Sequence, residues 1–142
     1  MPAVESADFE TLNKHDCFEL LSSAWLGRVG ISADALPAIL PVAYVVDGSS
    51  VVFRTSAGSK LDAVGEGQVI CFEVDHADRD LRTGWSVLVI GRAQEVTDPN
   101  ELARIDDLGI ERWSSPTADH YVRLPADVIS GRRTGMPVST SC

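Results

Sequence analysis

The chain has 142 residues, of which 44% are hydrophobic and 23% are charged, as is typical of one soluble globular domain with its own core. Its 21 acidic and 12 basic residues give a formal charge of −9, which argues against a nucleic-acid partner because phosphate groups would be repelled. No run of about 18 apolar residues could cross a membrane, and the N-terminal residues lack the basic and apolar regions of a secretory signal, so a cytoplasmic location is expected.

The first predicted element is a short helix. Residues 1–14 show no hydrophobic period and are expected to be flexible, as are residues 134–142 at the other end of the chain. The helix follows the N-terminal segment, with Asp16 as its expected cap and Gly27 as its expected end.

From Gly27 onward the hydrophobic pattern changes to period two, which is typical of strands. The segments "GRVGIS", "LPAILPVAYVVD" and "SSVVFRTS" predict an antiparallel meander with turns at residues 33–34 and 47–48. Pro37 and Pro41 fall inside the second segment, and because proline has no N–H to give to a ladder, they indicate an edge or a bulge there.

A second short helix is predicted at "SKLDAVGEG", residues 59–67, and strands return with "QVICFEVD" and "GWSVLVIGRAQEVTD". The acidic segment "HADRD" between these two strands is expected to form a solvated hairpin loop. The alternative is a cation site in the longer stretch "EVDHADRD" (Glu73, Asp75, His76, Asp78 and Asp80). Asp98 and Pro99 predict the start of a third helix, and residues 121–124 predict the last strand.

Six strands and three short helices are therefore expected over a single domain, residues 1–142. Short strands joined mostly by turns favour a mainly β (α+β) fold over alternating strands and helices. Gly91 interrupts a long strand pattern and would allow that strand to bend at a corner. The predicted architecture is a six-stranded antiparallel split β-barrel.

The segment "RTSAGSKL" indicates a possible anion site where a strand gives way to a helix. Ser59 could cap the helix, whose first free N–H groups and positive dipole end attract a phosphate, and Lys60 could add a charge-assisted contact. The alternative is that Ser59 only caps the helix while Lys60 lies in solvent. The local pattern does not separate these two interpretations.

The order of the segments "GRV", "LPVAYVVDG", "VVFRTSAGSKLDAV", "VICFEVD" and "GWSVLVIGRAQEV" resembles the pyridoxamine 5'-phosphate oxidase-like family of flavin-binding split β-barrels, in particular its small actinobacterial-type members. The resemblance covers roughly residues 17–133. It implies an FMN-binding flavoprotein that is an oxidoreductase acting on an unidentified small molecule. It also implies a homodimer with the cofactor at the interface between the two copies.

The resemblance implies a set of cofactor-binding residues at matching positions. The strand through "PVAY" would lie against the flavin through its backbone, Arg54 and Thr55 would contact the ring and ribityl chain, and the Ser59–Lys60 pair would hold the phosphate. Trp85 could stack near the flavin or belong to the core, and Ser86 stands where a polar residue reaches the ring. The implied cofactor-binding residues are Pro41, Val42, Ala43, Tyr44, Arg54, Thr55, Ser59, Lys60, Trp85 and Ser86.

Alternatives from the same fold are a deazaflavin-dependent reductase and a flavin- or haem-binding protein that stores or senses its ligand without turnover. The oxidases proper hold their vitamin substrate with a C-terminal arginine and histidine, but no histidine follows Tyr121, so vitamin B6 oxidase activity is not expected. The three histidines are too scattered to predict a metal site or a catalytic triad, and no catalytic residue is assigned.

Overall fold

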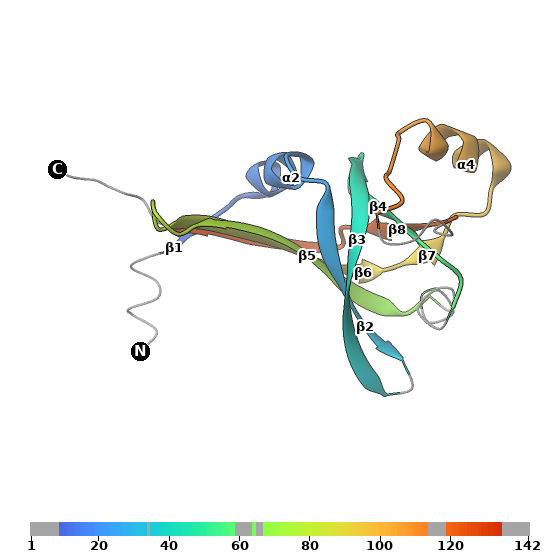
Figure 1. Ribbon diagram of the computed structural model, residues 1–142, viewed down its shortest axis with the longest axis horizontal. Coiled ribbons are helices and arrows are strands. Elements are labelled where there is room, and N and C mark those ends of the chain that lie inside the picture. Colours follow the sequence, from blue (N-terminus) through green and yellow to red (C-terminus); the bar gives the residue numbers. More distant parts are fainter. Residues whose placement is uncertain (1–8, 34, 59–63, 65–66, 114–118, 135–142) are drawn as a thin grey trace.

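The computed structural model describes residues 9–33, 35–58, 64, 67–113 and 119–134 (Figure 1). The helix predicted over residues 59–67 lies mostly outside these ranges, as do Ser59 and Lys60. Within the described part of the chain, no helix is long and apolar enough to cross a membrane.

The described residues form one antiparallel sheet of nine strands together with two helices. In chain order the elements are β1 (Phe9–Thr11), α2 (Lys14–Ser22), β2 (Leu26–Ala33), β3 (Leu36–Asp47), β4 (Ser50–Thr55), β5 (Val69–Asp78), β6 (Thr83–Arg92), β7 (Gln94–Glu95), α4 (Pro99–Asp106), β8 (His120–Pro125) and β9 (Val128–Thr134). The strands pair in the order β1-β9-β6-β5-β2-β3-β4-β8-β7.

This order makes the sheet curl back on itself. Only Ala93 separates β6 from β7, yet β6 pairs with β5 and β9 while β7 pairs with β8 at the far end of the order. One bent path therefore reaches two distant parts of the sheet, as a barrel requires. The predicted split-barrel fold class is confirmed.

The predicted number of strands was wrong, for three local reasons. The long strand expected through Gly91 is divided at Ala93 into β6 and β7. The chain turns after Pro125 into a further strand, β9. The third addition is β1, which pairs with β9 from Phe9↔Thr134 to Thr11↔Arg132, so residues 9–11 belong to the sheet although a flexible segment was expected there.

The bounds and the cap of the first helix also differ from the prediction. Asn13, rather than Asp16, is the N-cap, and its side-chain oxygen accepts a hydrogen bond of 2.8 Å from the Asp16 N–H. Asp16 lies in the first turn, where a negative charge is favourable beside the free N–H groups. The helix ends at Ser22, and Gly27 lies within β2, where a Cβ would come within 2.4 Å of the Phe72 ring.

The two prolines of β3 lie where the sequence indicated an edge. β3 pairs with β2 along Leu36–Ala43, but it pairs with β4 only from Tyr44 to Asp47. Pro37 and Pro41 are four residues apart, so their nitrogens point to the same side of the strand. Proline is tolerated on an unpaired edge of this kind because no ladder hydrogen bond is lost.

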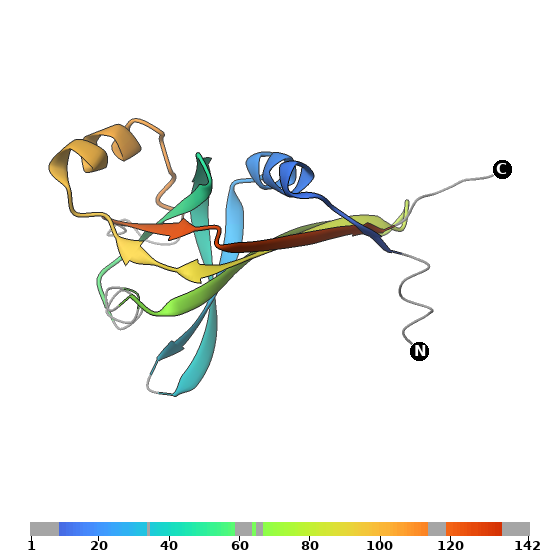
Figure 2. The ribbon, with the colours of Figure 1, turned by 180° about the vertical axis from the view of Figure 1, so that it is seen from behind.

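The β5–β6 hairpin is longer than expected and forms an arm with β9 and β1 (Figures 1 and 2). β5 continues to Asp78 and pairs with β6 from Val69↔Arg92 to Asp78↔Thr83. The loop predicted to begin at His76 was therefore wrong for residues 76–78, and the turn itself is limited to residues 79–82. Both described ends of the chain, β1 and β9, lie along this arm.

Two hydrophobic cores stabilise the sheet. The main core fills the inside of the curl with β-branched and aromatic side chains, joined by Cys17 and Leu21 of α2. The second core lies on the outer face of β3, β4 and β8, where α4 covers it (Ala43, Val52, Val96, Ile105, Ile110 and Tyr121). The predicted start of α4 is confirmed: Asp98 is its N-cap and accepts a hydrogen bond of 3.0 Å from the Glu101 N–H.

A charged network ties α4 to the barrel. Asp47, at the end of β3, accepts hydrogen bonds from Arg104 of α4 at 2.8 Å and from Arg123 of β8 at 2.8 Å. Arg123 also donates to Glu101 at 2.9 Å. The hydrogen bonds from the two arginines lower the pKa of Asp47 to about 2.

We expect Asp47→Asn to lower the free energy of unfolding near neutral pH by about 2 kcal/mol. Because the pKa of Asp47 is lower in the folded than in the unfolded chain, its stabilising effect is present above about pH 4 and is lost as the pH falls towards about 2. Urea unfolding of wild type and variant over this pH range measures the difference. Asp80→Asn, in the exposed turn of the arm, is the control, and a deficit for Asp47→Asn that stays constant with pH would contradict the assignment.

Candidate functional site

A cavity of about 50 Å³ lies at the place where β3 and β4 separate. The two strands pair from Tyr44↔Phe53 to Asp47↔Ser50, and beyond this pairing they diverge and leave a split in the barrel wall. Residues from β2, β3, β4 and the segment after β4 line the cavity (Val29, Ile31, Leu40, Pro41, Val42, Phe53, Arg54, Thr55, Ser56 and Val64).

The cavity combines an apolar floor with a polar rim. Val29, Ile31 and Phe53 belong to the main core and supply the floor. Along the rim no described strand pairs with β3 opposite Leu40–Val42 on the side facing the split. The Pro41 carbonyl oxygen points to this side of β3 and is available to a ligand, since the pairing with β2 does not use it.

Four of the ten predicted cofactor-binding residues meet at this cavity. Pro41 and Val42 come from β3, and Arg54 and Thr55 come from the end of β4. Antiparallel pairing through the hairpin at residues 48–49 brings these two parts of the sequence together. The remaining cavity residues escaped the sequence interpretation, although the alternation of β2 and β4 could have indicated Val29, Ile31 and Phe53 as inward-facing.

The side chain of Arg54 contacts residues on the α4 side of the sheet. Its side chain is 10% exposed and donates a hydrogen bond of 2.8 Å from Nη1 to the Ile110 carbonyl oxygen. The guanidinium also lies 5.0 Å from the centre of the Tyr121 ring and 3.9 Å from an Asp119 oxygen. The guanidinium therefore faces the second core.

Ala43 and Tyr44 were expected at the cofactor, but their side chains are buried in opposite cores. Ala43 lies in the second core, beneath α4. Tyr44 lies in the main core, donates its hydroxyl hydrogen bond to the Leu21 carbonyl oxygen and packs edge-on against Phe72. Burial raises the pKa of Tyr44, and only the backbone of these two residues remains for contact with a ligand.

Trp85 and Ser86 lie on the arm, away from the lining of the split cavity. Both border an open hollow of about 430 Å³, together with Phe9, Asp75, His76, Ala77, Gly84, Arg132 and Thr134. Trp85 is partly buried against the main core, and Ser86, its neighbour in β6, projects to the other face of the strand. Within one chain, the predicted site residues therefore form two groups.

The outer face of β5 carries a pair of carboxylates. Glu73 and Asp75 are two residues apart in the strand and so project from the same face, while Arg28 of β2 approaches Glu73 at 3.9 Å. Partial burial, and then the neighbouring Asp75, raise the pKa of Glu73 to about 7, although Arg28 opposes the shift. Of the acidic stretch considered for a cation, only Asp80 lies in the turn, because β5 runs to Asp78.

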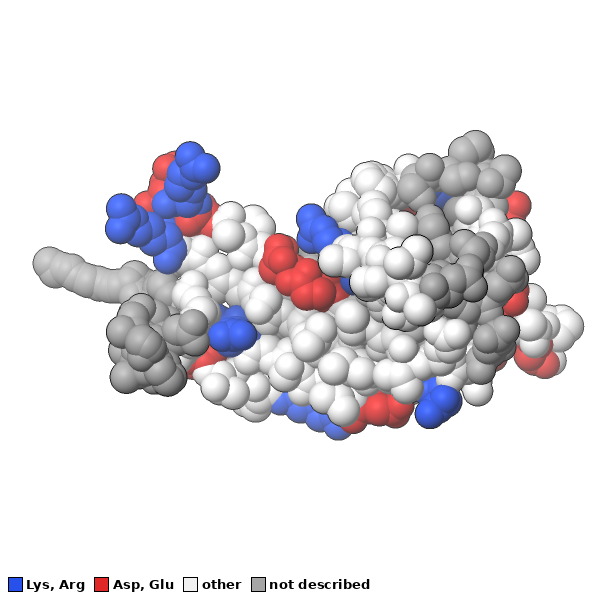
Figure 3. Space-filling model, turned by 90° about the horizontal axis from the view of Figure 1, so that it is seen from below, with Lys and Arg blue, Asp and Glu red and all other residues white. Residues whose placement is uncertain are grey.

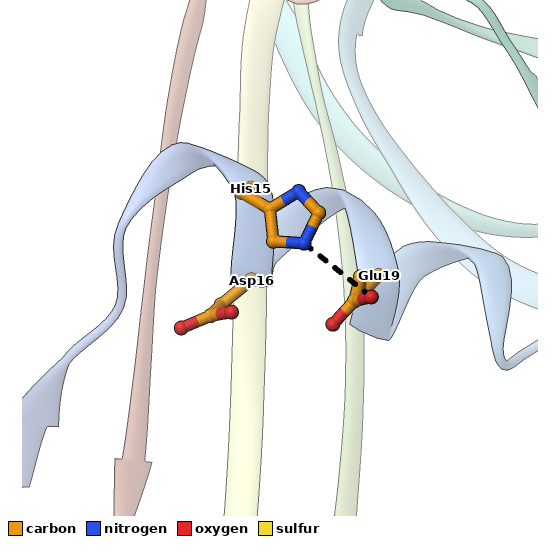
Figure 4. A group of neighbouring side chains, drawn as sticks. All are labelled: His15, Asp16 and Glu19. Carbon is orange, nitrogen blue, oxygen red and sulfur yellow. Dashed lines mark ion pairs between the residues drawn. The ribbon is translucent and has the colours of Figure 1, made fainter.

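One group of three possible metal ligands occurs among the described residues, on the surface of α2 (Figure 4). His15 Nε2 lies 3.4 Å from Glu19 Oε2, and Asp16 projects beside them. The side chains of His15 and Glu19 are 78% and 67% exposed. We interpret the contact as a helical i,i+4 pair in solvent.

Charges of both signs are mixed on the face of the molecule seen in Figure 3. Much of this face is uncharged, and acidic and basic side chains lie beside one another on it. Among the residues coloured in that view, no continuous basic surface suited to nucleic acid is seen.

Comparison with known proteins places these features in a family. Residues 13–133 match the family model described as "Pyridoxamine 5'-phosphate oxidase". The chain is 35% identical over 127 residues to protein Rv0080 of Mycobacterium tuberculosis, covering 86% of this chain and 83% of the relative.

Solved structures agree with this match. An FAD-binding protein from Mycobacterium smegmatis is 35% identical, with a TM-score of 0.74 over 89% of this chain and 98% of that protein. A conserved protein from Corynebacterium diphtheriae is 34% identical, with a TM-score of 0.73 over 91% of this chain and 99% of that protein. The split barrel, the order of its motifs and the match over residues 13–133 show that the chain belongs to the pyridoxamine 5'-phosphate oxidase family.

Proposed function

We propose that this protein binds a flavin nucleotide, FMN or its dinucleotide, in the split between β3 and β4 and uses it as an oxidoreductase on a small molecule. The observation that carries the proposal is the cavity itself. Four residues that the family motifs assign to the flavin, Pro41, Val42, Arg54 and Thr55, lie around this one cavity although two separate segments supply them.

The chemistry of the cavity fits such a ligand. A flavin has a flat, largely apolar ring whose edge carries hydrogen-bonding groups, and the cavity offers an apolar floor beside a strand edge with unpaired backbone groups. Thr55 and Ser56 add hydroxyl groups at the end of β4. The predicted phosphate contacts, Ser59 and Lys60, come after Ala57 and Gly58 in the sequence and lie outside the described residues.

The cavity of one chain is too small for a flavin, which supports a binding site completed by a second copy of the chain. A volume of about 50 Å³ is far below the roughly 300 Å³ or more of a typical ligand pocket. Beside the split, the part of β3 that pairs only with β2 exposes Leu36 at 70% and Ile39 at 73%, as expected of a surface that a partner covers. We propose a homodimer in which Trp85 and Ser86 of one copy approach the flavin held by the other.

A bound flavin would supply the electron or hydride transfer that none of the protein side chains can perform. The chain itself would bind and orient the ring through the rim of β3, and its apolar floor would exclude water from one face. Oxidation of a vitamin B6 phosphate is not part of the proposal, because no histidine follows Tyr121.

The test begins with the visible spectrum of the purified protein, followed by denaturation and chromatography of any released cofactor. We expect the two flavin absorption bands, a released flavin nucleotide and a dimer by light scattering. The relative from Mycobacterium smegmatis is an FAD-binding protein, so FAD and FMN standards are both run. A deazaflavin or haem in the released fraction would select one of the alternatives. A colourless monomer whose melting temperature no flavin raises would refute the proposal.

A double variant tests the predicted phosphate contacts. We expect Ser59→Ala combined with Lys60→Ala to weaken FMN binding by about tenfold or more, since charge-assisted hydrogen bonds to the phosphate are removed. Fluorescence titration with FMN measures the effect, and Lys14→Ala, at the exposed start of α2, is the control. An unchanged dissociation constant would place the phosphate elsewhere.

A further inference from the structure

A histidine and a glutamate form a close pair on strands β7 and β8. His120 Nδ1 lies 2.8 Å from Glu95 Oε2, and the two side chains are 38% and 29% exposed. They lie far apart in the sequence, and the β7–β8 pairing from Gln94↔Arg123 to Glu95↔Val122 brings them together. Neither residue belongs to the cofactor-binding set that the family motifs imply.

The strand register places His120 beside the split cavity. His120 is the direct partner of Thr55 in the β4–β8 pairing, and Thr55 lines the cavity. Directly opposed residues have Cβ atoms about 5 Å apart and project to the same face of the sheet. That face is the inner one, because Phe53 and Val122, two residues farther along each strand, are both buried in the main core.

The partner of His120 determines which of its ring nitrogens is available. A carboxylate can only accept a hydrogen bond, so His120 donates from Nδ1 to Glu95. Nε2 is then left for another group, and in the charged imidazolium it is a donor. This arrangement, in which a carboxylate orients an imidazole, is common where a histidine contacts a ligand.

The other charged groups nearby lie on β4 and on the segment leading into β8. The Arg54 guanidinium is directed towards the outer face, over the Tyr121 ring, and Asp119 pairs with Arg112 at 3.0 Å. Glu95 is the charged group on β7. On the inner face at the end of β4, His120 therefore brings its imidazole Nε2 to the side on which the cavity lies.

We propose that His120, oriented by Glu95, donates a hydrogen bond from Nε2 to the phosphate of the bound flavin nucleotide. This inference rests on the proposed flavin site. It adds a contact from β8, a strand that the sequence motifs do not connect with the cofactor, at the end of β4, where Thr55 lines the cavity.

The experiment compares two ligands that differ only in the phosphate, FMN and riboflavin. Their dissociation constants are measured by fluorescence titration for wild type, His120→Gln, His120→Lys and Glu95→Gln. We expect His120→Gln to weaken FMN binding about tenfold and to leave riboflavin binding unchanged. His120→Lys should restore most of the lost affinity for FMN, and Glu95→Gln should show a smaller loss confined to FMN. His15→Gln, on the exposed face of α2, is the control.

The outcomes separate this inference from the proposed function. If wild type binds none of FMN, FAD and riboflavin, the proposed function is refuted and this inference with it. If both flavins bind but His120→Gln changes the two affinities equally or not at all, only the phosphate contact is refuted, and the pair is a cross-strand link between β7 and β8. Riboflavin binding also checks that each variant is folded. If His120→Gln does not fold, the test depends on His120→Lys, and the inference is overturned if this variant no longer binds FMN more tightly than riboflavin.

Discussion

Replacing Gly91 with valine is expected to lower the free energy of unfolding by about 3 to 5 kcal/mol. A Cβ at this position would lie 2.2 Å from the Pro125 carbonyl oxygen and 3.2 Å from a methyl group of Leu124. The oxygen belongs to the backbone where β8 ends, so a side-chain rotation cannot relieve the clash. β6 approaches β8 closely at this point because the barrel closes here.

Chemical denaturation followed by tryptophan fluorescence measures this loss, and Gly30→Val is the matched control. A Cβ at Gly30 meets one atom within 4 Å, Cys71 Sγ at 2.6 Å, and that side chain can rotate away. We expect the control to cost about 1 kcal/mol. Equal losses for the two variants would show that the contact between β6 and the end of β8 does not set the closure of the barrel.

Thr55→Trp is expected to reduce flavin affinity by about a hundredfold while the protein remains folded. Thr55 lies at the end of β4, is only partly buried and lines the cavity. An indole at this position would fill the small volume between β3 and β4, and displacing the ligand from a close-packed contact costs several kilocalories per mole. The main core below Phe53 would remain in place, because Thr55 is the last residue of the strand.

Fluorescence titration with FMN, accompanied by thermal unfolding, measures this effect. Thr83→Trp is the control, since Thr83 also lies at a strand end and is partly buried, but on the arm. The proposed location predicts that only the Thr55 variant loses affinity. If Thr55→Trp binds flavin as wild type does, the split between β3 and β4 is not the binding site.

The predicted cofactor-binding residues show what the sequence motifs can and cannot predict about the site. They assigned Pro41, Val42, Arg54 and Thr55 to one ligand, and the structure places all four around one cavity. The motifs cannot tell which face of a strand each side chain takes. Ala43 and Tyr44 follow Val42 directly, yet their side chains are buried in opposite cores.

The alternation of apolar residues determined most strands of the barrel, though not β1, the division of β6 from β7, or β9, since a period of two requires that one face be buried. In the same way, Asp98 and Pro99 determined the start of α4 through local hydrogen bonding and a fixed backbone angle. These features depend on neighbours within a few residues, so they can be predicted from the sequence alone.

Tertiary structure alone decided where the barrel splits and which distant residues meet. The pairing of β3 with β4 stops at Tyr44, and His120 comes to lie opposite Thr55 although the two residues are 65 positions apart in the sequence. Strand order and register set these distances, and they follow from the packing of the whole sheet. For this reason the Glu95–His120 pair, which no local motif marks, became visible only in the folded chain.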